Sequence, residues 1–138
     1  MSLFTSLRIS ASGLTAERLR MDVISNNIAN ANSTRTPEGG PYQRQRVVFS
    51  SIAARTYGES GSGVAVVAID TDERQGNVVH EPDHPDADET GYVEYPNVDI
   101  ATEMVDMISA SRAYQANVVA MQSAKNMVIH ALDIIKGS

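Results

Sequence analysis

The sequence predicts a mainly α-helical protein in which long N- and C-terminal helices pack in a coiled-coil-like manner, with a small β insertion between them. Two observations carry this prediction. Apolar residues recur every seven positions near both ends of the chain, and a segment rich in Gly, Pro, Val and Ile separates those ends. We therefore divide the 138 residues into an N-terminal helical part (1–33), an irregular, β-rich middle segment containing a hairpin (34–96) and a C-terminal helical part (97–138).

The N-terminal part is predicted to form one amphipathic helix over residues 2–29. Its apolar stripe combines a seven-residue repeat with neighbours on the same face: Leu3, Leu7, Ala11, Leu14, Met21, Ile24 and Ile28. Gly13 is expected to weaken this helix slightly, by about 1 kcal/mol relative to Ala. A cluster of asparagines at positions 26, 27, 30 and 32 is expected to end the helix, because Asn tolerates left-handed backbone and bonds to local carbonyls.

The middle segment begins with helix-breaking residues at 37–41 and continues with two Val- and Ile-rich runs, 43–52 and 64–69, that are typical of strands. The Gly- and Ser-containing stretch 57–63 between them is expected to be the turn of a hairpin. Residues 77–80 are expected to add a short third strand, whereas 80–96 is predicted to be a loop because of its prolines and acidic residues.

The C-terminal part predicts a helix over residues 99–136, about 55 Å long at 1.5 Å per residue. Six apolar positions recur at seven-residue spacing, namely Ile100, Met107, Tyr114, Met121, Val128 and Ile135. A companion set comprises Met104, Ser111, Val118, Lys125 and Leu132. Either Asn97 or Asp99 can cap the start of the helix. We expect this stripe to pack partly on the N-terminal helix and partly on other subunits; the alternative is an ordinary buried helix in a bundle.

Composition excludes several classes of function. The chain has no cysteine, which excludes disulfides, thiolate zinc sites and cysteine nucleophiles, and its net charge of −6 argues against general nucleic-acid binding. Residues 1–55 carry a net charge of +4 and residues 56–138 one of −10. This asymmetry reflects either two solvated surfaces of opposite sign or complementary charge between neighbouring copies. The sequence shows neither a signal-peptide pattern nor an apolar run long enough to span a membrane.

The one constellation that could carry chemistry lies in the acidic segment after residue 80. His80, His84 and Asp86 could ligate a metal ion for hydrolysis, but Pro82 and Pro85 prevent the helix that would place both imidazoles on one face. A solvated loop is the favoured interpretation, and no catalytic, metal-binding or cofactor-binding residue is predicted. A metal-dependent hydrolase and an amphipathic helix lying on a membrane surface remain as alternatives.

Four stretches together resemble one known family. They are Ile9–Ala16 continuing to Ser25–Asn32, Gly39–Arg44, Pro82–Ala87 continuing through Gly91–Val93 to Pro96–Val98, and Glu103–Asn117. The first and last are similar to the terminal signatures of the flagellar rod, hook and hook-junction proteins. The middle two narrow the resemblance to the proximal part of the rod. The resemblance covers nearly the whole chain.

The resemblance implies a non-enzymatic structural subunit that polymerises through its terminal helices into the torque-transmitting rod of the bacterial flagellar basal body. It also implies export by the flagellar type III apparatus without a cleaved signal peptide, and a place in the rod where it crosses the periplasm. The implied partners are further copies of the chain and the rod proteins FlgB, FlgF, FlgG and FliE. No nucleic acid, membrane span or cofactor is expected.

Both the repeats and the signature asparagines, which are expected to cap helix ends and to bridge subunits, enter the predicted set of subunit-contact residues. That set is Leu3, Leu7, Leu14, Met21, Ile24, Asn27, Ile28, Asn30, Ile100, Met104, Met107, Tyr114, Asn117, Val118, Met121, Val128, Leu132 and Ile135.

Overall fold

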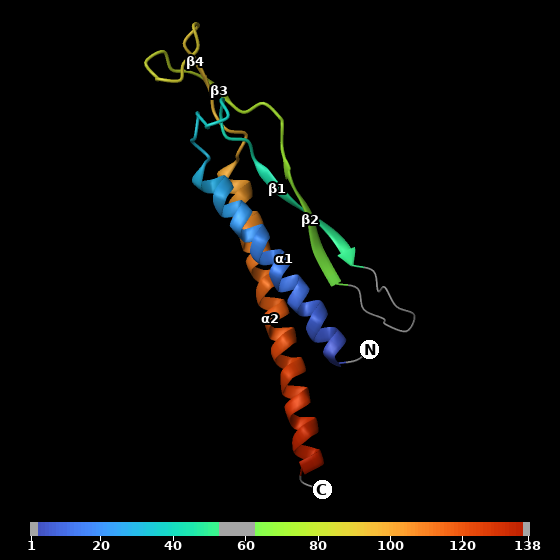
Figure 1. The fold of residues 1–138 in the computed structure, drawn as a ribbon. Helices are drawn as coiled ribbons and strands as arrows, with labels where there is room; N and C mark the ends of the chain where they lie inside the picture. Colours follow the sequence, from blue (N-terminus) through green and yellow to red (C-terminus); the bar gives the residue numbers. More distant parts are fainter. Residues whose placement is uncertain (1–2, 53–62, 137–138) are drawn as a thin grey trace.

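A computed structural model describes residues 3–52 and 63–136 of the chain. The fold is elongated, with two long helices side by side, one β-hairpin along the first helix and a second, short hairpin at one end (Figure 1). Helix α1 spans Leu3–Ala29 and helix α2 spans Ile100–Lys136. The predicted mainly helical architecture with a small β region is therefore confirmed.

The ends of both helices lie where the sequence signals place them. Helix α1 stops within the asparagine cluster, where Asn30 donates its backbone N–H to the Asn26 carbonyl and its side-chain amide to the same residue. At the start of α2, Asp99 is the cap, because its carboxylate accepts bonds from the Ala101 N–H at 3.0 Å and the Thr102 hydroxyl at 2.7 Å. Asn97, the other predicted cap, has a different role, described below.

The two helices are antiparallel, and two contacts define their register. The Asn27 amide donates to Glu103 Oε2 at 3.0 Å, and Gly13 lies so close to Asn117 that an added Cβ would be 2.9 Å from its Oδ1. Fourteen residues separate Gly13 from Asn27, and fourteen separate Glu103 from Asn117. By this register the start of α1 lies level with about residue 127 of α2. The last turns of α2 therefore continue beyond α1, as Figure 1 shows.

The predicted hairpin is confirmed. Strands β1 (Gln45–Ile52) and β2 (Gly63–Thr71) pair antiparallel, with an irregularity between Val48 and Phe49. Most of the predicted turn, residues 57–62, lies outside the described residues. The hairpin is fastened to α1 at both ends, because the Ser12 hydroxyl accepts a bond from the Val64 N–H and the Asn27 amide donates to the Gln45 carbonyl.

The segment predicted as a loop, 80–96, contains a strand. Strand β3 (Val78–His80) fulfils the expected third strand, and β4 (Tyr92–Glu94) pairs with it antiparallel. A tight turn makes this pairing possible, because Asp88 accepts bonds from the backbone of Thr90 and Tyr92, and Gly91 adopts a φ of +82°. The prediction of a loop was wrong at β4. The strand has only three residues and one buried side chain, and the prolines and acidic residues around it indicated a loop.

The helix–helix seam differs in composition from the predicted apolar stripe. The residues of α2 that are covered most completely are small or polar: Glu103, Ala110 and Ala124, with Asn117 between them at the same seven-residue spacing. The predicted companion set lies on the flank of α2, where Met104 is 57% exposed and Leu132 is 50% exposed. Small residues allow the helix backbones to approach closely, so the long apolar side chains are left at the edge of the seam.

Candidate subunit interface

A buried polar network joins α1, α2 and the base of the first hairpin. The side chains of Asn27 and Glu103 are both fully buried. The Asn27 amide donates to Glu103 and to the Gln45 carbonyl, and its Oδ1 accepts from the Gln45 N–H and the Tyr42 hydroxyl, both at 2.9 Å. Every polar group of Asn27 is thus satisfied inside the subunit. These bonds are all internal to one subunit, and the bridge from Asn27 to a neighbouring subunit stays a prediction.

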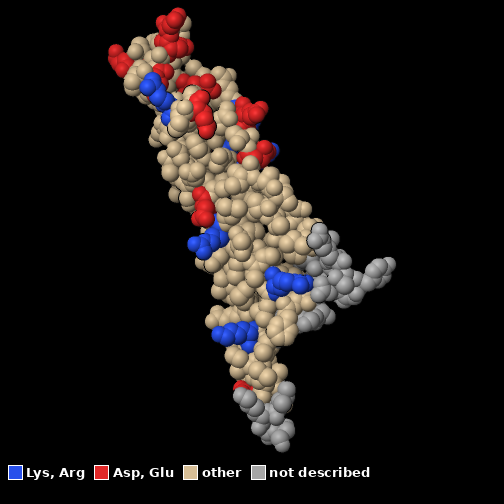
Figure 2. Space-filling view, in the orientation of Figure 1, with Lys and Arg blue, Asp and Glu red and all other residues tan. Residues whose placement is uncertain are grey.

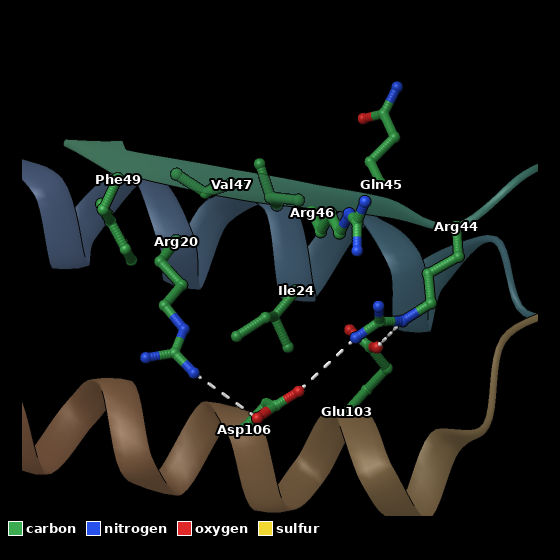
Figure 3. A pocket seen from close by; sticks show the side chains of 10 residues that line it. Arg20, Ile24, Arg44, Gln45, Arg46, Val47, Phe49, Glu103 and Asp106 are labelled. Carbon is green, nitrogen blue, oxygen red and sulfur yellow. Dashed lines mark hydrogen bonds and ion pairs between the residues drawn. The ribbon is translucent and has the colours of Figure 1, made fainter. Parts of the chain in front are cut away.

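Arg44 neutralises the buried carboxylate of this network. Its Nε donates to Glu103 Oε1 at 2.6 Å, and its Nη2 lies 3.5 Å from Asp106 Oδ2, while Arg20 reaches the other oxygen of Asp106 at the same distance (Figure 3). The Asn97 side chain accepts from the Arg44 N–H and donates to the carbonyls of Asp72 and Arg74. These contacts join both helices to the two ends of the first hairpin, because Arg44 precedes β1 and Asp72 follows β2.

The phenol of Tyr42 shows the electrostatic character of this cluster. Burial raises the pKa of the Tyr42 hydroxyl above its ordinary value, and the negative charge of Glu103 raises this pKa further. The phenol therefore remains a neutral hydrogen-bond donor to Asn27 across the physiological pH range. This hydrogen bond joins the segment before β1 to the end of α1.

Part of the charge asymmetry of the sequence is balanced by ion pairs within the subunit. The basic N-terminal part pairs with the acidic remainder through Arg20–Asp106, Arg44–Glu103, Arg46–Asp70 and Arg35–Asp86. Neither of the two explanations offered by the sequence anticipated this internal pairing. Figure 2 shows most of the visible acidic side chains at the end that carries β3 and β4, and fewer charged side chains toward the opposite end.

The predicted subunit-contact residues separate into groups by exposure. Ile24 and Asn27 are buried, and four are exposed at the flank of α2, namely Ile100, Met104, Val118 and Leu132. Partly buried positions along the seam and its edges are Leu7, Leu14, Met21, Ile28, Asn30, Met107, Tyr114, Asn117, Met121 and Val128. The side chains of Leu3 and Ile135 lie outside the described part of the structure.

Further exposed apolar residues on α2 were not singled out from the sequence. Val105, Ile108, Val119, Met127, Ile129 and Ile134 are each at least 45% exposed. Because they fall between the seven-residue repeats, a search for one stripe passes over them. The signal that identifies them is a lack of charge: between Ala113 and Leu132 the only charged residue is Lys125, and between Leu3 and Ala16 it is Arg8. An exposed, charge-poor helix pair is an unusual surface for a monomer.

The two histidines of the acidic segment have structural contacts. His80 stacks edge-to-face on Tyr92 with ring centroids 4.9 Å apart, and His84 Nδ1 accepts a bond from the Asp86 N–H. The Asp86 carboxylate accepts from the Thr34 hydroxyl and pairs with Arg35. Among residues 3–52 and 63–136, no group of three or more His, Asp or Glu side chains is arranged to hold a metal ion. Within the same residues, no helix is long and apolar enough to cross a membrane.

Two protein-family models match the two ends of the chain. Residues 7–35 match the model described as flagella basal body rod protein, and residues 89–132 match the model for the C-terminal part of the flagellar basal body rod FlgEFG proteins. The matched regions contain most of α1 and α2, including Asn27 and Glu103 of the buried network.

Curated proteins named flagellar basal-body rod protein FlgC are similar to this chain over nearly its whole length. The flagellar basal-body rod protein FlgC of Borreliella burgdorferi is 47% identical, with 99% of this chain and 100% of that protein covered. The FlgC proteins of Bacillus subtilis and Salmonella typhimurium are 45% and 40% identical, with at least 97% of each chain covered. The chain therefore belongs to the FlgC family of flagellar basal-body rod proteins.

Proposed function

We propose that this chain is a non-enzymatic structural subunit of the proximal flagellar rod, and that it polymerises through its terminal helices into the shaft that transmits torque. Family membership establishes a structural rod subunit of the flagellar basal body. The mode of polymerisation and the mechanical role are the proposal. In this proposal residues 1–33 and 97–138 form one terminal helical domain, and residues 34–96 form the segment that decorates it.

The observation that carries the proposal is the uncovered apolar surface of α2. Ten of its Ile, Leu, Met and Val side chains are at least 37% exposed, among them Met104, Ile108, Val119 and Leu132. Burial of one such side chain is worth about 1.5–3 kcal/mol. A helix 37 residues long that is covered on one side by α1 has the remaining sides available for neighbouring copies. Packing of heptad-spaced residues between copies would complete the predicted coiled-coil-like arrangement.

The partners in this proposal are further copies of the chain and the rod proteins FlgB, FlgF, FlgG and FliE. The charge-poor surface favours such partners, because neutral helices can pack closely without burying unpaired charges. We further propose that the flagellar type III apparatus exports the chain with its N-terminal segment intact, and that the assembled rod crosses the periplasm.

The test is replacement in a bacterium that lacks its own FlgC. The chain should restore basal bodies with complete rods, and isolated basal bodies should contain it at its full, uncleaved mass by mass spectrometry. Electron microscopy of the same preparation reports rod length. Complete rods from which the chain is absent would refute the proposed structural role, and a shortened N-terminus would refute export without cleavage.

A further inference from the structure

The side of α2 that faces away from α1 carries a second repeat, which we call the outer repeat. In alternating steps of three and four residues, it runs from Val105 and Ile108 through Arg112 to Asp133. Arg112 follows the buried Ala110 by two residues, about 200° around the helix, so the outer repeat lies opposite the seam with α1. All of its side chains are exposed. Steps of three and four residues are the spacing by which one helix packs on another in a coiled coil.

The outer repeat contains one cation and one anion, and the subunit supplies a partner to neither. Arg112 and Asp133 are exposed, and neither forms an ion pair with any side chain that the structure describes. The apolar members of the repeat are exposed as well, with Val105 at 67%, Ile108 at 54% and Ile129 at 45%. This face therefore combines unpaired charges with uncovered apolar surface, a combination that a partner helix can bury.

The order of these residues favours a second copy of the chain as that partner. Asp133 lies 21 residues after Arg112, and Ile129 lies 21 residues after Ile108. Two parallel α2 helices that are displaced by this length, which is three repeats, place Arg112 of one copy beside Asp133 of the other. The same displacement places Ile108 beside Ile129. One displacement thus satisfies both the charges and the apolar residues.

Other parallel registers leave the charges without partners. With no displacement, Arg112 faces the same residue of the second copy, and so does Asp133. A displacement of one repeat places Arg112 beside Val119 and Asp133 beside Asn126, and a displacement of two repeats exchanges these neighbours. Polar and charged residues at seam positions fix the register of coiled coils in this manner.

We propose that the outer repeat of α2 packs against α2 of a second, parallel copy displaced by 21 residues, with Arg112 beside Asp133 of that copy. The contact deepens the proposed function and rests on it. The displacement is about 32 Å at 1.5 Å per residue. Each copy uses residues 105–112 toward one neighbour and 126–133 toward the other, so the contact is head-to-tail and continues from copy to copy. Val119 of the displaced copy lies level with the start of α2 of the first.

Cross-linking tests this register directly, because the chain contains no cysteine. In the variant Ile108→Cys/Ile129→Cys, oxidised basal bodies should yield a ladder of covalent dimers, trimers and larger species. The single variants Ile108→Cys and Ile129→Cys are the controls and should yield no dimers, because neither residue faces its own counterpart. Dimers of a single variant, or complete rods of the double variant without a ladder, would overturn the contact while leaving the proposed function standing. Failure to form rods with the unmodified chain would overturn both.

Exchange of the two charges tests the ion pair. Arg112→Asp should lower the number of complete basal bodies per cell about tenfold, because it places two carboxylates side by side in every contact. Arg112→Asp/Asp133→Arg restores opposite charges and should return this number to within about threefold of the unmodified chain. The matched control is Lys125→Asp, which reverses an exposed cation of α2 outside the outer repeat and should have an effect below about threefold. A charge exchange that restores nothing, or a loss with Lys125→Asp as large as with Arg112→Asp, would overturn the proposed pair.

Discussion

The two ends of the helix pair differ in which side chains are buried and which are exposed. Where α1 ends and α2 begins, a fully buried carboxylate, a fully buried amide and an arginine close the structure upon itself. Toward the other end charges become rare, and apolar side chains such as Val119 and Ile129 face outward. The closed end determines how helices and hairpins are joined within one subunit. The open end supplies surface that a single subunit leaves uncovered, which is what a protein that functions as a polymer requires.

The largest expected effect on stability comes from removing the buried carboxylate at the closed end. Glu103→Ala should lower the free energy of unfolding by about 3–5 kcal/mol, because it leaves Arg44 without its buried counter-charge and removes a bond from Asn27. Denaturant unfolding followed by circular dichroism measures this loss. Glu89→Ala, at an exposed position, is the control and should change stability by less than about 0.5 kcal/mol. Equal stabilities of the two variants would mean that the network does not close this end.

A charge at the open end should separate folding from assembly. Val119→Asp should leave the free energy of unfolding within about 0.5 kcal/mol, because the side chain is 63% exposed in the subunit. It should nevertheless prevent rod assembly, since burial of an unpaired carboxylate against a neighbour costs several kcal/mol. Motility and sedimentation of the purified chain report assembly.

A matched variant sharpens this comparison within the same helix. Met121→Asp should destabilise the subunit itself as well as its assembly, because Met121 is partly buried at the seam with α1. Normal rods containing Val119→Asp subunits would show that this flank of α2 faces solvent in the polymer.

A substitution in the middle of the helix–helix seam should change the stability of the subunit only slightly. Gly13→Ala removes a poor helix former, a change worth about 1 kcal/mol in an exposed helix. An added Cβ would lie 2.9 Å from Asn117 Oδ1, and the Asn117 amide also donates to the Ala113 carbonyl. We therefore expect the gain to be cancelled, with a net change below about 1 kcal/mol. In the Asn117→Ala background the same substitution should recover its full stabilisation, which a double-mutant cycle measures.

The smallest expected effect concerns pH and the β3–β4 end. The hydrogen bond from Thr34 lowers the pKa of the Asp86 carboxyl below its ordinary value, and Arg35 and His84 add favourable charge. A lowered pKa in the folded state contributes stability above the unfolded value near 3.8, and this contribution is lost as the pH falls through the folded value. The protection factors of the amides in residues 81–94, meaning exchange rates corrected for the intrinsic pH dependence of exchange, should therefore fall below about pH 4. Asp86→Asn should weaken this pH dependence and leave α1 and α2 unchanged. The part that remains belongs to Asp88, because its pKa is also lowered by the backbone bonds that it accepts in the turn.

The sequence alone determined the secondary structure of the two ends and the kind of protein this is. Long heptad-spaced helices, an asparagine cluster at a helix end and a hairpin between turn residues are local patterns. They follow from side-chain periodicity and backbone preference. The helices over 3–29 and 100–136 accordingly begin and end within two residues of the predicted positions.

Tertiary structure decided which faces of those helices meet. The repeat of Ile100, Met107 and Tyr114 suggested an apolar seam, yet the residues buried most completely include Glu103 and Ala110. Periodicity places the buried face of a helix with an uncertainty of about one residue. A carboxylate such as that of Glu103 is expected at the surface unless its charge partners are known. Arg44 and Asn27, which are 59 and 76 residues away from Glu103 along the chain, supply those partners. Only the folded chain brings them together, and their charges and hydrogen bonds make burial of Glu103 possible.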